Sequence, residues 1–184
     1  YTIQQNSYGF NASNLIQDHS NAKSHFNQRF SPHAHHCQYG HAFMYYAIAH
    51  GKVKVGEYEV KHVLEDIESL NLRAVKGELE GTAISAGAYP TVEDKYRIMR
   101  VGASIGRNYG PLVVARSDRG NIPLEGSRIA IPGEYTTAYL LLRIYATGFE
   151  AVPMDFDVII SAVQEGKVDA GLLIHEGQIT YREQ

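Results

Sequence analysis

The chain has few of the features that mark secreted, membrane-spanning or nucleic-acid-binding proteins. It contains one cysteine, Cys37, which excludes an intramolecular disulfide framework and fits a reducing compartment. No apolar run approaches the roughly 20 residues of a membrane-spanning helix, and no apolar core of a secretory signal stands near the start. The 17 basic and 20 acidic residues give a formal charge of −3, which offers no general reason to expect nucleic acid or an anionic membrane as a partner. We therefore expect a cytoplasmic protein.

The composition is that of an ordinary globular protein with one polar segment. With 184 residues, 44% of them hydrophobic, the chain can bury a sizeable core as one larger domain or two small lobes. Residues 1–29 are rich in Asn, Gln, Ser and His and show no sustained period of 2 or 3.6. Nothing there could drive the burial of one face, and we predict a polar N-terminal extension.

Strand and helix patterns alternate along the second half of the chain. Short apolar runs predict strands, and apolar residues at helical spacing predict helices. We expect strands at 111–116, 128–131, 150–154 and 170–174, and helices at 135–146 and 156–164. This order is typical of parallel βαβ units with right-handed crossovers, so we predict an α/β fold.

The first half gives fewer signals. We expect helices at 42–50 and 66–76 and strands at 58–64 and 82–88. Gly51 and Gly77 are the predicted helix stops. Ser85, inside the last of these strands, could donate a hydrogen bond into a cleft, although a core or turn serine is the commoner use. No Gly-x-Ser-x-Gly frame surrounds it, so we predict no nucleophile there.

His175 arrives where the strand predicted at 170–174 should stop. In open α/β sheets ligands gather outside the carboxyl ends of the strands, and an imidazole titrates near physiological pH. His175 is therefore a candidate for chemistry. The alternative is a strand-end histidine held by a backbone carbonyl, and this stretch by itself leaves both readings open.

The strand-to-helix turn at 132–137 is a second candidate site. A helix start presents free N–H groups and a partial positive charge, and the hydroxyls of Thr136 and Thr137 add donors for a carboxylate, phosphate or carbonyl oxygen. The alternative is a plain N-cap threonine. The turn gains weight because its strand and the strand before His175 belong to one predicted parallel layer, whose carboxyl edges face one side.

Five potential metal ligands stand close together in the sequence: His33, His35, His36, Cys37 and His41. Imidazole and thiolate are good ligands for zinc, copper or nickel, so a metal-binding protein built on this loop is one hypothesis. The spacing matches no standard zinc module, and adventitious binding by a histidine-rich loop is the alternative that we favour.

Seven stretches of the chain occur together, and in this order, in one known family. They are 31–32, 42–52, 62–71, 83–85, 109–116, 131–138 and 168–181. On these motifs, which span residues 30–184, the chain resembles the menaquinone-biosynthesis enzymes of the futalosine route. The His-Glu-Gly-Gln segment at 175–178 and the Thr-Thr turn are more similar to the naphthoate-forming branch than to the related chorismate dehydratases.

The resemblance implies a two-lobed fold similar to type II periplasmic binding proteins, with a first lobe at 30–116 and a second at 117–184. It implies a carbon–carbon lyase that splits cyclic dehypoxanthine futalosine, releases 1,4-dihydroxy-6-naphthoate and needs no cofactor. His175 would be the general base that takes a proton to start the fragmentation. Ser85, Thr136 and Thr137 would hold carboxylate and hydroxyl oxygens of the substrate.

The chain departs from this family in two places. Histidines stand at 33, 35 and 36, where the family carries Asp or Asn after its Ser-Pro pair. The family also continues beyond the His-Glu-Gly-Gln segment, so we expect the C-terminal part that completes the first lobe to be missing. A second copy of the chain, in a homodimer, could cover the surface left exposed. A non-catalytic carboxylate-binding protein on the same scaffold remains the alternative function.

Overall fold

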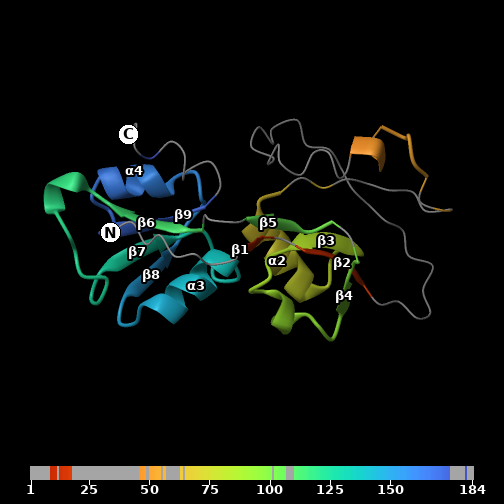
Figure 1. The fold of residues 1–184 in the computed structure, drawn as a ribbon, viewed down its shortest axis with the longest axis horizontal. Coiled ribbons are helices and arrows are strands. Elements are labelled where there is room, and N and C mark those ends of the chain that lie inside the picture. The colour runs from red at the N-terminus through yellow and green to blue at the C-terminus, as the bar shows by residue number, and fades with distance from the viewer. Residues whose placement is uncertain are drawn as a thin grey trace. The chain divides into compact units, whose positions relative to one another are not determined.

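The computed structural model describes residues 9–11, 13–17, 46–48, 50–54, 56, 63, 65–100, 102–106, 110–174 and 181. Its chain divides into two compact units, unit 1 with residues 1–10 and 105–184 and unit 2 with residues 11–104 (Figure 1). Each unit has its own sheet and its own buried core. The lobe boundary expected at 116–117 stays a prediction.

Unit 1 is built on a four-stranded sheet with the strand order β6-β9-β7-β8. The strands are β6 (Leu112–Ala115), β7 (Arg128–Ile131), β8 (Glu150–Pro153) and β9 (Ala170–Leu173). Strand β7 pairs in parallel with both β8 and β9, whereas β6 is antiparallel to β9. The mixed α/β architecture and the parallel pairing of the last three strands are therefore confirmed.

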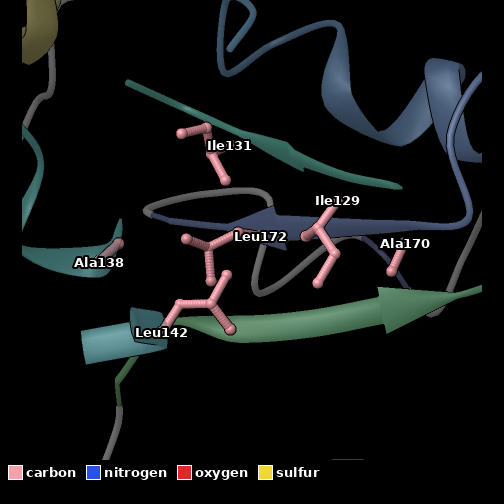
Figure 2. Close-up of a cluster of buried hydrophobic side chains, with 6 residues drawn as sticks. All are labelled: Ile129, Ile131, Ala138, Leu142, Ala170 and Leu172. Atoms are coloured by element: carbon pink, nitrogen blue, oxygen red, sulfur yellow. The ribbon is translucent and has the colours of Figure 1, made fainter. Parts of the chain in front are cut away.

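Helices α3 (Thr137–Tyr145) and α4 (Ile159–Gln164) cover opposite faces of this sheet. Successive strand residues point to opposite faces, so Ile129 and Ile131 pack with Leu142 of α3, while Ala130 packs with α4. Figure 2 shows the α3-side core, in which six buried side chains meet: Ile129, Ile131, Ala138, Leu142, Ala170 and Leu172. The two interior strands are consequently apolar on both faces, as expected for strands in a layered α/β fold.

Gly171 lets α4 approach the sheet closely. A methyl group at this position would lie 2.5 Å from Ile159 Cγ2 and 2.9 Å from Val163 Cγ2. Distances this short are well inside van der Waals contact, so a side chain at Gly171 would force α4 outward. The glycine in the middle of β9 is thus required by helix packing.

Both predicted helices of unit 1 begin later in the structure than expected. Helix α4 begins at Ile159 and not at Phe156. Residues 155–158 form a turn first, in which the Val158 N–H donates to the Asp155 carbonyl at 3.1 Å. Helix α3 begins at Thr137, behind its N-cap Thr136, and not at Tyr135.

Unit 2 contains a three-stranded antiparallel sheet with the order β3-β2-β4. Its strands are β2 (Ser13–Gln17), β3 (Gly81–Ile84) and β4 (Tyr96–Ile98), and β1 (Gly9–Asn11) pairs separately with β5 (Ser104–Gly106). The segment expected to be a polar extension therefore contributes the middle strand of this sheet. A pattern within the segment could not reveal this, because the partners of β2 come more than 60 residues later.

Helix α2 (Ile67–Lys76) has strong signals at both ends, and its prediction is confirmed. Asp66 Oδ1 accepts hydrogen bonds from the N–H groups of Glu68 and Ser69, at 2.9 and 3.0 Å. Gly77 ends the helix with φ 73°, and its N–H and that of Glu78 bond back to Ala74 and Arg73 in a Schellman motif.

The other described helical residues of the first half agree with the predicted glycine stop. Residues 46–48 are helical, and Gly51 follows with φ 64°. The strand expected at 58–64 falls outside the described residues except for Val63. Among the parts of the chain that the structure describes, no helix is both long and apolar enough to cross a membrane.

Tyr96 anchors the core of unit 2. Its side chain is almost fully buried, and its hydroxyl donates to the Leu79 carbonyl at 2.6 Å. Burial raises the pKa of Tyr96, because the phenolate would lose its hydration. The tyrosine therefore packs as a neutral group.

Asp169 joins the amino edge of the unit 1 sheet to the turn at 117–119. Its Oδ1 accepts from Arg119 Nη1 at 2.7 Å, and its Oδ2 accepts from the Arg128 backbone N–H at 2.9 Å. These contacts, with the backbone N–H of Arg128 first, lower the pKa of Asp169 against the opposing effect of burial. The carboxylate thus fastens residues 41 and 50 positions away in the chain.

We predict that Gly171→Ala lowers the free energy of unfolding by about 1–3 kcal/mol, because the new methyl group overpacks the contact between β9 and α4. Urea denaturation of the two proteins measures the difference. Ser161→Ala, on the exposed side of α4, is the matched control and should change stability by less than about 0.5 kcal/mol. Equal stability of Gly171→Ala and wild type would contradict the close approach of α4.

Asp169→Asn should remove a stabilisation that depends on pH. Because the pKa of Asp169 is lower in the folded chain, its carboxylate stabilises the fold above the unfolded pKa, and this is lost as pH falls through the folded pKa. The difference in unfolding free energy between wild type and variant should be largest near neutral pH and shrink below about pH 4.

Urea denaturation at a series of pH values tests this expectation, with Asp118→Asn as the control. The partner of Asp118 is Arg116, two residues away. A pair so local also forms in the unfolded chain, so the pH-dependent difference should be smaller. A difference for Asp169→Asn that does not vary with pH would contradict the assignment.

Candidate functional site

The carboxyl ends of β7 and β9 lie next to each other, because these strands are parallel neighbours with Ala130 opposite Gly171. Strand β7 ends at Ile131 and leads into the turn before α3, and β9 ends at Leu173. The common edge predicted for the two strands is confirmed. His175, two positions after the end of β9, lies outside the described residues.

Thr136 is the N-cap of α3. Its hydroxyl accepts a hydrogen bond from the Tyr139 N–H at 3.2 Å and donates its own hydrogen to the Gly133 carbonyl at 2.8 Å. The residue is 3% exposed. Its side chain therefore has the capping role considered as the alternative, and the single hydroxyl hydrogen is already used.

Thr137 is the first residue of α3 and is half-buried. At a helix start the first N–H groups have no acceptor within the helix, and they carry partial positive charge. The sheet edge thus presents main-chain donors beside the end of β9. The groups of this turn that suit an anionic oxygen are its backbone N–H groups and Thr137.

Ser85 lies just beyond β3 and not inside a strand, which corrects the strand predicted at 82–88. Its N–H donates to Asn71 Oδ1 at 2.9 Å, so a side chain takes the donor that a neighbouring strand would otherwise bind. The Ser85 carbonyl then accepts from the Ala88 N–H at 2.9 Å and closes a turn. The strand ends because its hydrogen-bond ladder is interrupted.

Asn71 is a residue that sequence reasoning missed. It is fully buried in the middle of α2, and its Nδ2 donates to Ser85 Oγ at 3.1 Å and to Glu68 Oε2 at 3.2 Å. The available signal was local: asparagine is a weak helix former in an interior position, and it lies on one face with Glu68 and Ala74. No local sequence pattern indicates that its partner is Ser85.

The structure thus supports two groupings of the predicted site residues. Ser85 belongs to unit 2 with Asn71, and Thr136 and Thr137 belong to unit 1 at the shared edge of β7 and β9. The histidine cluster, His33 to His41, lies outside the described residues. Within the described ranges, no three His, Cys, Asp or Glu side chains gather in a way that could hold a metal ion.

A cavity of about 340 Å³ in unit 1 does not coincide with this edge. The cavity is lined by Ala115, Ala170 and Tyr145, and by apolar residues of the loop before β7. Ala170 begins β9 and Tyr145 ends α3, so the cavity lies toward the amino ends of the parallel strands. Its walls carry no acid or base, and we place the candidate site at the carboxyl edge, where α/β sheets bind ligands.

Comparison with known proteins shows what this chain is similar to. A family model described as menaquinone biosynthesis matches residues 34–184. A 1,4-dihydroxy-6-naphthoate synthase from Thermus thermophilus is 47% identical over 139 residues, covering 76% of this chain and 50% of that protein. A protein with the same name from Streptomyces coelicolor is 39% identical over 146 residues, covering 76% and 51%. The chain spans about half the length of these curated relatives.

A solved structure is also similar. The crystal structure of protein AF1704 from Archaeoglobus fulgidus matches with a TM-score of 0.70 and 58% sequence identity. The match covers 77% of this chain and 52% of that one. At this identity the two chains share their fold over the matched part.

We predict that Thr136→Ala lowers the free energy of unfolding by about 1 kcal/mol, because the N-cap bond to Tyr139 is lost. Thr136→Ser keeps the hydroxyl and should retain most of the stability. Thermal denaturation of both variants against wild type measures the difference. Two variants of equal stability would show that the hydroxyl does not cap α3.

Proposed function

The chain belongs to the menaquinone biosynthesis family, and on that premise we propose that the protein is a carbon–carbon lyase. It converts cyclic dehypoxanthine futalosine to 1,4-dihydroxy-6-naphthoate. The observation that carries the proposal is the parallel pairing of β7 with β9, which brings the Thr136-Thr137 turn to the edge from which the chain continues to His175. The names of the two curated relatives support the choice of substrate.

His175 serves as the general base. An imidazole has an unperturbed pKa of about 6.5, so its neutral form is plentiful near neutral pH and can remove a proton from the substrate. The proton goes to the imidazole, and the electron pair that it leaves forms a new π bond as the carbon–carbon bond breaks. The electrons of the broken bond are taken up by a carbonyl group of the substrate that is conjugated with the departing carbon, so the step needs no cofactor.

Substrate oxygens are held by two kinds of donor. At the start of α3 the main-chain N–H groups and Thr137 bind a carboxylate oxygen, supported by the helix dipole. Thr136 contributes by holding this turn in place, since its hydroxyl is bonded to Gly133 and Tyr139. Ser85 binds a further oxygen from unit 2.

We extend the proposal to the architecture. The protein adopts a two-lobed, periplasmic-binding-protein-like fold, with lobes at 30–116 and 117–184. A homodimer is compatible with this scheme, and so is a cytoplasmic location.

A non-catalytic carboxylate-binding protein is the second candidate function. The donors at the α3 start and at Ser85 would bind an anionic ligand equally well without any base. The two functions differ in what His175 does, and this difference sets the experiment.

We expect the intact protein to form 1,4-dihydroxy-6-naphthoate from cyclic dehypoxanthine futalosine, detected by mass spectrometry, and His175→Ala to lower kcat by at least about 100-fold. Substrate affinity, measured by equilibrium dialysis, should change little, because the base acts in the transition state. His50→Ala is the matched control, since the His50 ring bonds only the Tyr46 carbonyl and stacks on the Tyr46 ring among the described contacts.

Binding without product by a folded wild-type protein would favour the carboxylate-binding function. Turnover that persists in His175→Ala would assign the base to another residue. Equal losses in His175→Ala and His50→Ala would indicate that the loss of activity reflects a damaged fold.

A further inference from the structure

Asn71 and Ser85 form a buried polar contact in unit 2. Asn71 is 0% exposed and Ser85 is 5% exposed, although they stand 14 residues apart. Two hydrogen bonds join them, from the Ser85 N–H to Asn71 Oδ1 at 2.9 Å and from Asn71 Nδ2 to Ser85 Oγ at 3.1 Å. A buried amide with this many partners holds its neighbour in one geometry.

The partners of Asn71 leave one orientation for its amide. The Ser85 N–H can only donate, so the atom facing it must be the carbonyl oxygen Oδ1. The Glu68 carboxylate oxygen accepts, so the atom facing it must be the amino nitrogen Nδ2. Both requirements agree, and exchanging the two atoms would place donor against donor at Ser85.

This orientation determines what the Ser85 hydroxyl can do. A serine hydroxyl carries one hydrogen and can accept through its lone pairs. Since Asn71 Nδ2 occupies Oγ as a donor, the hydroxyl hydrogen must be directed elsewhere. Among the described residues, no acceptor for that hydrogen is found within hydrogen-bond distance. The hydroxyl is therefore presented as a donor.

We propose that Asn71 is a positioning residue, which holds the Ser85 hydroxyl as a hydrogen-bond donor toward an anionic oxygen of the substrate. This inference rests on the proposed function, in which Ser85 binds a substrate oxygen. A fixed donor favours carboxylate or carbonyl oxygens and disfavours ammonium or amide N–H groups at the same place. Asn71 thus determines which chemical class of ligand group Ser85 can bind, although Asn71 itself does not contact the ligand.

The location of Asn71 supports a role beyond stability. Asparagine in a helix interior is less favourable than alanine, and its burial adds the cost of desolvating an amide. An apolar residue at this position would avoid these costs, but it would leave the Ser85 N–H without its partner and the Ser85 hydroxyl free to rotate.

The test is a double-mutant cycle with Ser85→Ala, Asn71→Ala and the double variant of the intact protein. KM and kcat are measured with cyclic dehypoxanthine futalosine, and the Kd of 1,4-dihydroxy-6-naphthoate is measured by calorimetry. We expect each single variant to weaken binding about tenfold, as for a hydrogen bond to a charged oxygen, with little change in kcat. The double variant should bind no more weakly than Ser85→Ala, because Asn71 acts through Ser85.

Thr82→Val is the matched control. Thr82 is a buried threonine of β3 whose hydroxyl donates to the Ala83 carbonyl at 2.9 Å, and its loss should affect stability without affecting KM. If Asn71→Ala does not fold, Asn71→Ser takes its place in the cycle, since its hydroxyl can satisfy one of the two buried partners. Ser85→Thr keeps the donor and should retain affinity.

Unchanged affinity in the folded Asn71 variant, or additive losses in the double variant, would overturn the inference. Different results would show that the proposed function is wrong. A wild-type protein that binds the naphthoate but forms no product contradicts the lyase, and the cycle in Kd still decides the role of Asn71. A wild-type protein that binds neither compound overturns both.

Discussion

The pairing of β7 with β9 is the contact on which the architecture of unit 1 depends. Strand β9 is the last strand among the described residues, yet it lies inside the sheet and bonds to β6 on one side and β7 on the other. It can do so because Gly171 admits α4 on one face and Leu172 fills the α3 core on the other. The four residues of β9 therefore pack against both helices and pair with both neighbouring strands.

The same pairing concentrates the chemistry of unit 1 at one edge of the sheet. Parallel neighbours end on the same side, so the helix start that follows β7 and the chain that leaves β9 meet there. Two of the three hydroxyl residues singled out from the sequence nevertheless act in opposite ways. Thr136 uses its hydrogen to hold the Gly133 carbonyl, whereas Ser85 receives a hydrogen bond from Asn71 and keeps its own hydrogen for an acceptor.

Local signals predicted most of unit 1 and the helix of unit 2. The 128–131 strand agrees with the structure at both ends, and α2 ends at its predicted glycine stop, Gly77. Long-range pairing was less visible. Strand β2 sits in a polar segment without periodicity and is defined by its partners β3 and β4. Strand β3 is shorter than predicted because a side chain from α2 takes the Ser85 N–H.

The sequence by itself determined the family and the alternation of strand and helix. Strands and helices are visible in the sequence because their patterns depend on residues within a few positions of one another. Only the tertiary structure decided that the Thr136 hydroxyl donates to the Gly133 carbonyl and that Asn71 contacts Ser85. A hydroxyl rotates about one bond, and its direction depends on whichever donor or acceptor the fold brings near. For Ser85 that group is 14 residues away on another element, beyond the reach of any local pattern.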